Sequence, residues 1–140
     1  MTKTAKYSRY SGIQTVFKNA GESGCLFLSL LSIAEEYTRL PIDFIFAYNK
    51  CLDFGLIDTD FYCKDQEKIL NIFTGKVWKK TVKEELPYPV PQNMYTVAKW
   101  YNKRTKFTHF RRRGFDTLNN SVTVNEGKII EYYCYTVQEI

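Results

Sequence analysis

The chain has 140 residues, of which 44% are hydrophobic and 16% aromatic, and its net charge is +5. This length and apolar content suit one domain, 1–140, with a proper core, and they exclude an intrinsically disordered chain. The first residues are polar, and the longest apolar stretch, 25–34, is too short to cross a bilayer. We therefore expect a cytoplasmic protein that does not enter a membrane.

Cysteine usage agrees with that compartment. The four cysteines are Cys25, Cys51, Cys63 and Cys134, and His109 is the only histidine. Cytoplasmic thiols stay reduced, and the absence of any C-x-x-C pair speaks against a structural zinc site. We expect no metal and no cofactor.

The first half of the chain has helical patterns. A glycine-containing loop, 7–24, leads into a helix over 25–37 that is apolar nearly all round and should be buried. Pro41 fits the first position of a second helix, 42–54, with an apolar stripe. The stripe consists of Ile42, Ile45, Phe46, Tyr48 and Leu52. A third helix should begin after Asp65 as N-cap and end at Gly75.

The second half has the pattern of strands. We expect one strand over 77–82, a hairpin from 95–101 and 106–111, and two further strands over 121–124 and 128–137. The last two flank a glycine-containing turn at 125–127. Helices followed by an antiparallel sheet define the α+β class.

Cys25 is the best candidate for chemistry. It occupies the first turn of the buried helix, where unpaired N–H groups and the helix dipole favour a thiolate and can bind an oxyanion. The alternative is that Cys25 is a small apolar residue that packs the start of the helix.

A cysteine nucleophile needs a base, and His109 on the strand 106–111 is the only histidine that can serve. If Phe107 does not share its face of the strand, the side chain of His109 can point toward the helix of Cys25. The alternative is that His109 is a surface imidazole in a basic strand. Asp116 is the first choice for a group that orients the ring, with Asn119 and Asn120 as alternatives. All three can instead stabilise turns.

Basic residues gather between 76 and 113, where eleven Lys and Arg face only Glu84 and Glu85. Such a surface favours a nucleic acid or an acidic protein as partner, although it can also be a solvated face. The candidate contact residues are Lys99, Trp100, Tyr101, Lys103, Arg104, Arg111, Arg112 and Arg113.

Several short motifs together resemble a known family. They are 24–30 (GCLFLSL), 54–58 (FGLID), 108–110 (THF) and 115–124 (FDTLNNSVTV) with 127–129 (GKI). Their order is similar to that of the papain-like cysteine peptidase superfamily, in particular to its bacteriocin-processing branch and to small phage- and prophage-borne relatives of unknown function.

The resemblance implies a papain-like fold, in which N-terminal helices pack on a C-terminal antiparallel sheet. It implies Cys25 as nucleophile, His109 as base and Asp116 as the orienting residue. The family places an amide side chain upstream of the cysteine in the oxyanion hole; Asn19 lies at a suitable separation, and Gln14 is further away.

Two functions follow as hypotheses. The first is a thiol hydrolase of phage or mobile-element origin that cleaves a peptide or isopeptide bond of a protein substrate. The second is a catalytically silent papain-like scaffold, for example an anti-defence protein, whose basic and aromatic face binds nucleic acid or a protein that handles nucleic acid.

Overall fold

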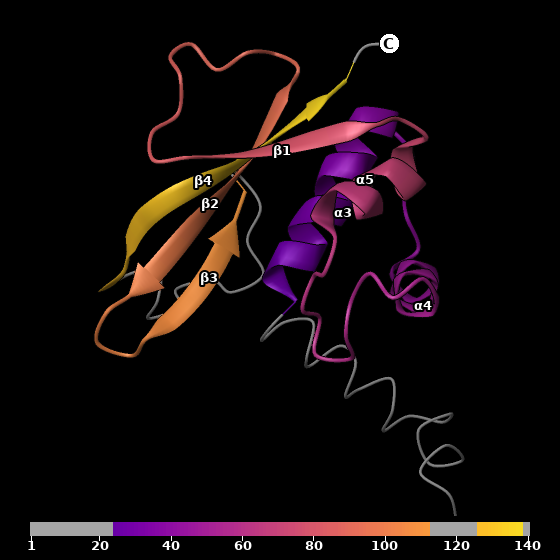
Figure 1. Cartoon of the computed structure of the whole chain (residues 1–140), viewed down its shortest axis with the longest axis horizontal. Coiled ribbons are helices and arrows are strands. Elements are labelled where there is room, and N and C mark those ends of the chain that lie inside the picture. The colour runs from indigo at the N-terminus through magenta and orange to yellow at the C-terminus, as the bar shows by residue number, and fades with distance from the viewer. Residues whose placement is uncertain (1–23, 113–125, 139–140) are drawn as a thin grey trace, which may run out of the picture.

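The computed structural model describes residues 24–112 and 126–138. Three helices come first in this part of the chain, and four strands follow (Figure 1). The helices are α3 (Cys25–Thr38), α4 (Phe44–Asp53) and α5 (Gln66–Thr74), and the strands are β1 (Trp78–Lys83), β2 (Met94–Asn102), β3 (Phe107–Arg111) and β4 (Lys128–Val137). The α+β class expected from the sequence is confirmed for these residues.

The strands form one antiparallel sheet in the order β1-β4-β2-β3. The C-terminal strand β4 therefore lies between β1 and β2, and β3 lies at an edge. A bulge between Lys99 and Trp100 shifts the register of β2 against β4. Figure 1 shows the helices gathered to one side of this sheet.

Helix α3 is the central element, as its apolar sequence predicts. It contacts α5 as well as strands β2 and β3. Arg39 ends the helix in the left-handed conformation (φ 60°), and its N–H donates to the carbonyl of Glu35. The Glu35 carboxylate then accepts a hydrogen bond from the N–H of Ile42 at 2.8 Å, which fixes the connection to α4.

Helix α4 begins later than predicted. Its N-cap is Asp43, whose carboxylate accepts a hydrogen bond from the N–H of Phe46 at 2.7 Å, so Pro41 lies outside the helix. The buried residues of α4 are Ala47, Tyr48 and Cys51, whereas Phe46 is 58% exposed. The predicted apolar stripe is therefore wrong at Ile45 and Phe46, because this short helix buries a narrower face.

Helix α5 is capped as predicted and leads directly into the sheet. Asp65 caps its N-terminus by accepting the N–H of Lys68, and Gly75 ends it with φ 71°. The Asn71 side chain accepts the N–H of Trp78 at 2.8 Å, and the Trp78 indole donates to the Thr74 hydroxyl at 2.7 Å. These bonds connect the end of α5 to the start of β1.

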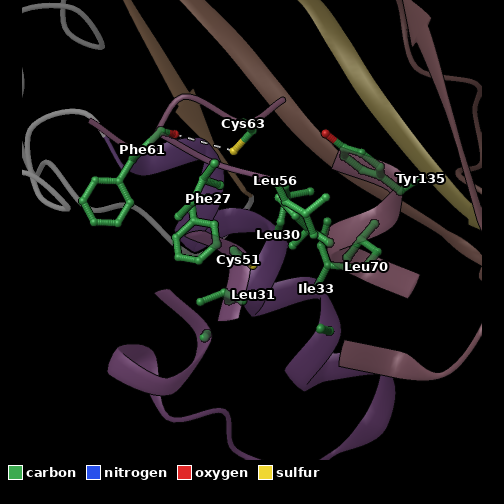
Figure 2. Packing of buried hydrophobic residues seen from close by; sticks show 14 of the residues in the cluster. Phe27, Leu30, Leu31, Ile33, Cys51, Leu56, Phe61, Cys63, Leu70 and Tyr135 are labelled. Atoms are coloured by element: carbon green, nitrogen blue, oxygen red, sulfur yellow. Dashed lines mark hydrogen bonds between the residues drawn. The ribbon is translucent and has the colours of Figure 1, made fainter. Parts of the chain in front are cut away.

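The core lies between α3, α5 and the sheet. Figure 2 shows Leu30 and Ile33 of α3 close to Leu56 and Leu70, with Tyr135 of β4 at the side. Leu30, Ile33, Leu70 and Tyr135 are fully buried. The face of the sheet that carries Tyr135 is therefore the face that the helices cover.

Some expectations lie outside the described residues, among them the strand over 121–124 and most of the turn at 125–127. Within the described ranges, no helix combines the length and the apolar character needed to span a membrane.

Candidate active site

Cys25 is the first residue of α3, in the position that the sequence predicts. Gly24 precedes it as N-cap and provides no side-chain hydrogen bond to the helix end, and the first turn contains no acidic residue. The N-terminal amides and the dipole of the helix therefore lie beside the thiol without a carboxylate from that turn. Cys25 is only 5% exposed.

The thiol lies against the edge strand of the sheet. The backbone N–H of Phe110 in β3 donates to Sγ of Cys25 at 3.5 Å. A hydrogen bond of this kind stabilises a thiolate more than a thiol, because the partial positive charge of the amide hydrogen faces the sulfur. The start of α3 and the edge strand β3 are therefore in contact through the sulfur of Cys25.

This contact also limits how far Cys25 can lie from His109. Two backbone bonds of about 1.52 and about 1.33 Å separate the Cα of His109 from the nitrogen of Phe110. With the 3.5 Å hydrogen bond, Sγ of Cys25 lies within about 6.4 Å of the Cα of His109. The thiol and the residue predicted as its base are therefore neighbours.

His109 itself is completely buried rather than on the surface. It lies opposite Trp100 in the β2–β3 pair, and strand alternation puts its side chain on the face opposite to Phe110. Phe110 packs on the helix-covered core.

The remaining residues of the predicted catalytic set, Asp116 and Asn19, lie outside the described residues. The same holds for their alternatives, Gln14, Asn119 and Asn120. The described part of the site consists of Cys25, His109 and the strand that joins them.

A cleft of ≈ 550 Å³ opens beside the thiol. Its lining combines aromatic rings with two lysines: Cys25, Cys63, Phe61, Tyr62, Lys80, Lys99, Phe107, Phe110 and Tyr133 are among its residues. His109 does not line it. The cleft gives access to the sulfur of Cys25 from the helix-covered face of the sheet.

The other three cysteines have environments that disfavour a thiolate. All four are free thiols. Burial raises the pKa of Cys63 to about 12 and that of Cys51 to about 11, and it also raises the pKa of Cys134. The Sγ of Cys63 donates to the Phe61 carbonyl at 3.7 Å, which also favours the protonated form.

The residues predicted to bind nucleic acid do not share one face. Alternation places Lys99 and Tyr101 on one side of β2 and Trp100 on the other. Arg113 lies outside the described residues, Lys103 is exposed in the β2–β3 turn, and Arg111 lies opposite Ala98.

Several of these cations are also neutralised by carboxylates. Lys99 pairs with Glu131 at 3.3 Å, and Arg104 pairs with Glu126. Arg112 pairs with Glu36 and donates to the Ser32 hydroxyl at 2.8 Å, so it connects β3 to α3. The positive surface seen in the sequence is therefore smaller in the fold.

Sequence reasoning missed Lys80 and Tyr133 as residues of the cleft. They come from β1 and β4, which are neighbours only because β4 inserts between β1 and β2. The alternation of β1 could have placed Lys80 on the inner face with Trp78, but no local signal connects that face to Cys25. Between 24 and 112 and between 126 and 138, no group of three or more His, Cys, Asp or Glu could hold a metal ion.

Comparison of the chain with protein-family models, with curated proteins and with solved structures gives no significant match.

Proposed function

We propose that this protein is a thiol-dependent acyl hydrolase of papain-like type that cleaves a peptide or isopeptide bond. The observation that carries the proposal is the position of Cys25. Its sulfur lies at the start of a buried helix, accepts the Phe110 N–H at 3.5 Å and lines a cleft of ≈ 550 Å³. Each of these features favours a nucleophile over a packing residue.

His109 is the proposed base. The upper limit of about 6.4 Å between Sγ and the Cα of His109 leaves the ring within reach when its χ angles direct it toward the edge of the sheet. Of the two ring nitrogens, Nδ1 is closer to the backbone, so Nδ1 would accept the thiol proton. Burial of the ring would keep bulk water from competing for that proton.

The reaction would proceed in two stages, acylation of Cys25 and hydrolysis of the thioester. The sulfur of Cys25 attacks the carbonyl carbon while His109 takes its proton, and first-turn N–H groups of α3 bind the oxyanion. His109 returns the proton to the leaving amine, which departs as the C–N bond breaks. Water then attacks the thioester with His109 as base, and the acid product and the free thiol result.

Asp116 and Asn19 complete the proposal on the strength of the sequence resemblance. Asp116 would orient His109 through the second ring nitrogen, and Asn19 would add a donor to the oxyanion hole. An origin in a phage or mobile element belongs to the same resemblance.

Alkylation by iodoacetamide at neutral pH, followed site by site by mass spectrometry, tests the proposal. Cys25 should react at least about ten-fold faster than Cys51, Cys63 and Cys134, because only its thiolate is stabilised. The His109→Ala protein should lose most of that advantage. Asn102→Ala is the matched control, since Asn102 is equally buried in the same hairpin and caps its turn.

Equal and slow alkylation of all four cysteines would contradict the hydrolase. The catalytically silent scaffold would then be the better proposal, with nucleic acid or a nucleic-acid-handling protein as partner. It is the second candidate because Lys99, Arg104 and Arg112 are already paired with carboxylates.

A further inference from the structure

Two lysine ammonium groups lie around one aromatic ring in the cleft beside Cys25. The Nζ of Lys80 lies 3.8 Å from the centroid of the Tyr133 ring, and the Nζ of Lys99 lies 5.9 Å from it. Both lysines line the cleft that Cys25 lines. Tyr133 is 9% exposed, so the cations meet at a wall of the cleft rather than on an open surface.

Their charge is compensated only in part. Lys99 has an ion pair with Glu131 at 3.3 Å, whereas no carboxylate of the described residues forms an ion pair with Nζ of Lys80. The Glu67 carboxylate bonds the backbone of Lys80, whose N–H donates to it at 2.8 Å. The described lining of the cleft contains no Asp or Glu. One positive charge therefore remains in a cleft whose other walls are aromatic rings, thiols and neutral polar groups.

The surroundings of Lys80 make that charge costly. Its pKa is lowered, first because burial removes water from the ammonium group and further because Lys99 is close, although Glu131 and Glu67 oppose the shift. A cation over an aromatic face gains only part of what it loses with its water. An anion in the cleft would supply the missing partner.

We propose that this cleft binds the carboxylate of an acidic residue in the peptide substrate, with Lys80 as the principal contact and Lys99 as the second. The inference rests on the proposed function in one respect, namely that the bound peptide is a substrate. Binding of an acidic peptide does not require turnover, because the two lysines of the cleft would attract the peptide even if Cys25 never reacted.

Tyr133 has a positioning role in this arrangement. Its ring contacts Phe110 with a centroid distance of 5.3 Å, and the N–H of Phe110 donates to Cys25. The two ammonium groups therefore lie over the Tyr133 ring, and the thiol contacts the backbone of its neighbour Phe110. An acidic side chain held by Lys80 would lie close to the bond that Cys25 attacks.

Charged thiol reagents test the cleft directly. Cys25 is treated with sulfonatoethyl methanethiosulfonate, an anion, and with trimethylammonioethyl methanethiosulfonate, a cation of similar size. In both reactions the Cys25 thiolate attacks the reagent sulfur, a mixed disulfide forms and methanesulfinate leaves. The ratio of the two rates, divided by the same ratio for a free small thiol, reports the local potential.

The wild-type ratio should favour the anion, and Lys80→Met should lower it about five-fold, since one nearby charge is lost. Lys79→Met is the matched control. It removes the same charge from the same strand, but Lys79 is exposed on the opposite face of β1, so the ratio should stay within about two-fold. A ratio that does not favour the anion, or that falls equally in both variants, would overturn the inference.

A second measurement applies if Cys25 resists both reagents. Fluorescence polarisation compares the binding of a short labelled peptide with one central glutamate, and of its glutamine twin, to the Cys25→Ser protein. Tighter binding of the glutamate peptide that Lys80→Met abolishes supports the inference, and equal binding overturns it. Failure of the hydrolase is seen separately, as alkylation of Cys25 that His109→Ala does not slow.

Discussion

At the scale of single residues, the protein distinguishes its four thiols by their neighbours. Cys25 accepts a backbone N–H at the start of a helix, whereas Cys63 donates its proton to a carbonyl and is buried among apolar residues. Two cysteines that line the same cleft therefore have different hydrogen-bond partners at their sulfur atoms. The sequence alone predicts the special position of Cys25, because a cysteine after Gly24 and before an apolar helix is a local pattern.

Cys63 should make the stability of the protein depend on pH in the alkaline range. Its pKa rises from 9.0 in the unfolded chain to about 12 in the folded protein, because burial disfavours the thiolate. Between these values the unfolded state loses the proton first, so it binds fewer protons and the free energy of unfolding falls as the pH rises. Below pH 9 both states hold the proton, and the contribution is fully present.

The measurement is urea unfolding of the wild type and of Cys63→Ala from pH 7 to 11. Above about pH 9 the wild type should lose up to about 1.4 kcal/mol per pH unit more than the variant. Between pH 7 and 8 the difference between the two proteins should be constant, which serves as the internal control. Parallel curves over the whole range would show that the Cys63 thiol ionises as easily in the folded protein as in the unfolded chain.

At the scale of elements, capping residues in the sequence predicted most of the helix boundaries. The sequence did not predict the buried face of a helix where tertiary packing determines it. Asp65 and Gly75 delimit α5 as predicted, because a capping carboxylate and a left-handed glycine act within one turn. At α4 the nearer cap, Asp43, prevails over Pro41. Its buried face could not be predicted, since the neighbours that cover Ala47 and Cys51 come from elsewhere in the chain.

The cap of α5 can be tested by Asp65→Ala. The carboxylate of Asp65 accepts the N–H of Lys68 at 3.0 Å, and loss of an N-cap costs about 1 kcal/mol of the free energy of unfolding. Urea unfolding at neutral pH measures the change. Asp53→Ala is the matched control, because Asp53 is the last residue of α4, where a negative charge opposes the helix dipole.

The control should leave the stability unchanged or raise it by a few tenths of a kcal/mol. If both substitutions cost the same, the hydrogen bond of Asp65 would contribute nothing beyond its charge.

At the scale of the whole molecule, the candidate site depends on how the helices meet the sheet. The α+β class follows from the order of helical and strand patterns along the chain. The position of β4 between β1 and β2 does not, because pairing of Lys128–Val137 with two strands that precede it is a long-range choice. That choice brings Lys80 and Tyr133 together, and it explains why the lysines of the cleft could not be predicted.

Helix α3 fixes the position of Cys25 relative to the sheet, since its apolar side packs on the sheet and its first residue contacts β3. Leu30, one turn beyond the thiol, is fully buried in that packing, as Figure 2 shows. Leu30→Ala should lower the free energy of unfolding by about 2 to 5 kcal/mol, because it removes buried methyl groups and leaves a cavity. Urea unfolding measures the loss.

Leu40→Ala provides the comparison, because Leu40 is 65% exposed after the end of α3. The same chemical change there should alter the stability by no more than about 0.5 kcal/mol. If the packing of α3 also holds the thiol against Phe110, Leu30→Ala should reduce the alkylation advantage of Cys25 under conditions where the protein is still folded, whereas Leu40→Ala should not. If the alkylation advantage of Cys25 were unchanged in Leu30→Ala, its reactivity would depend on the first turn of α3 alone and not on the contact between the helix and the sheet.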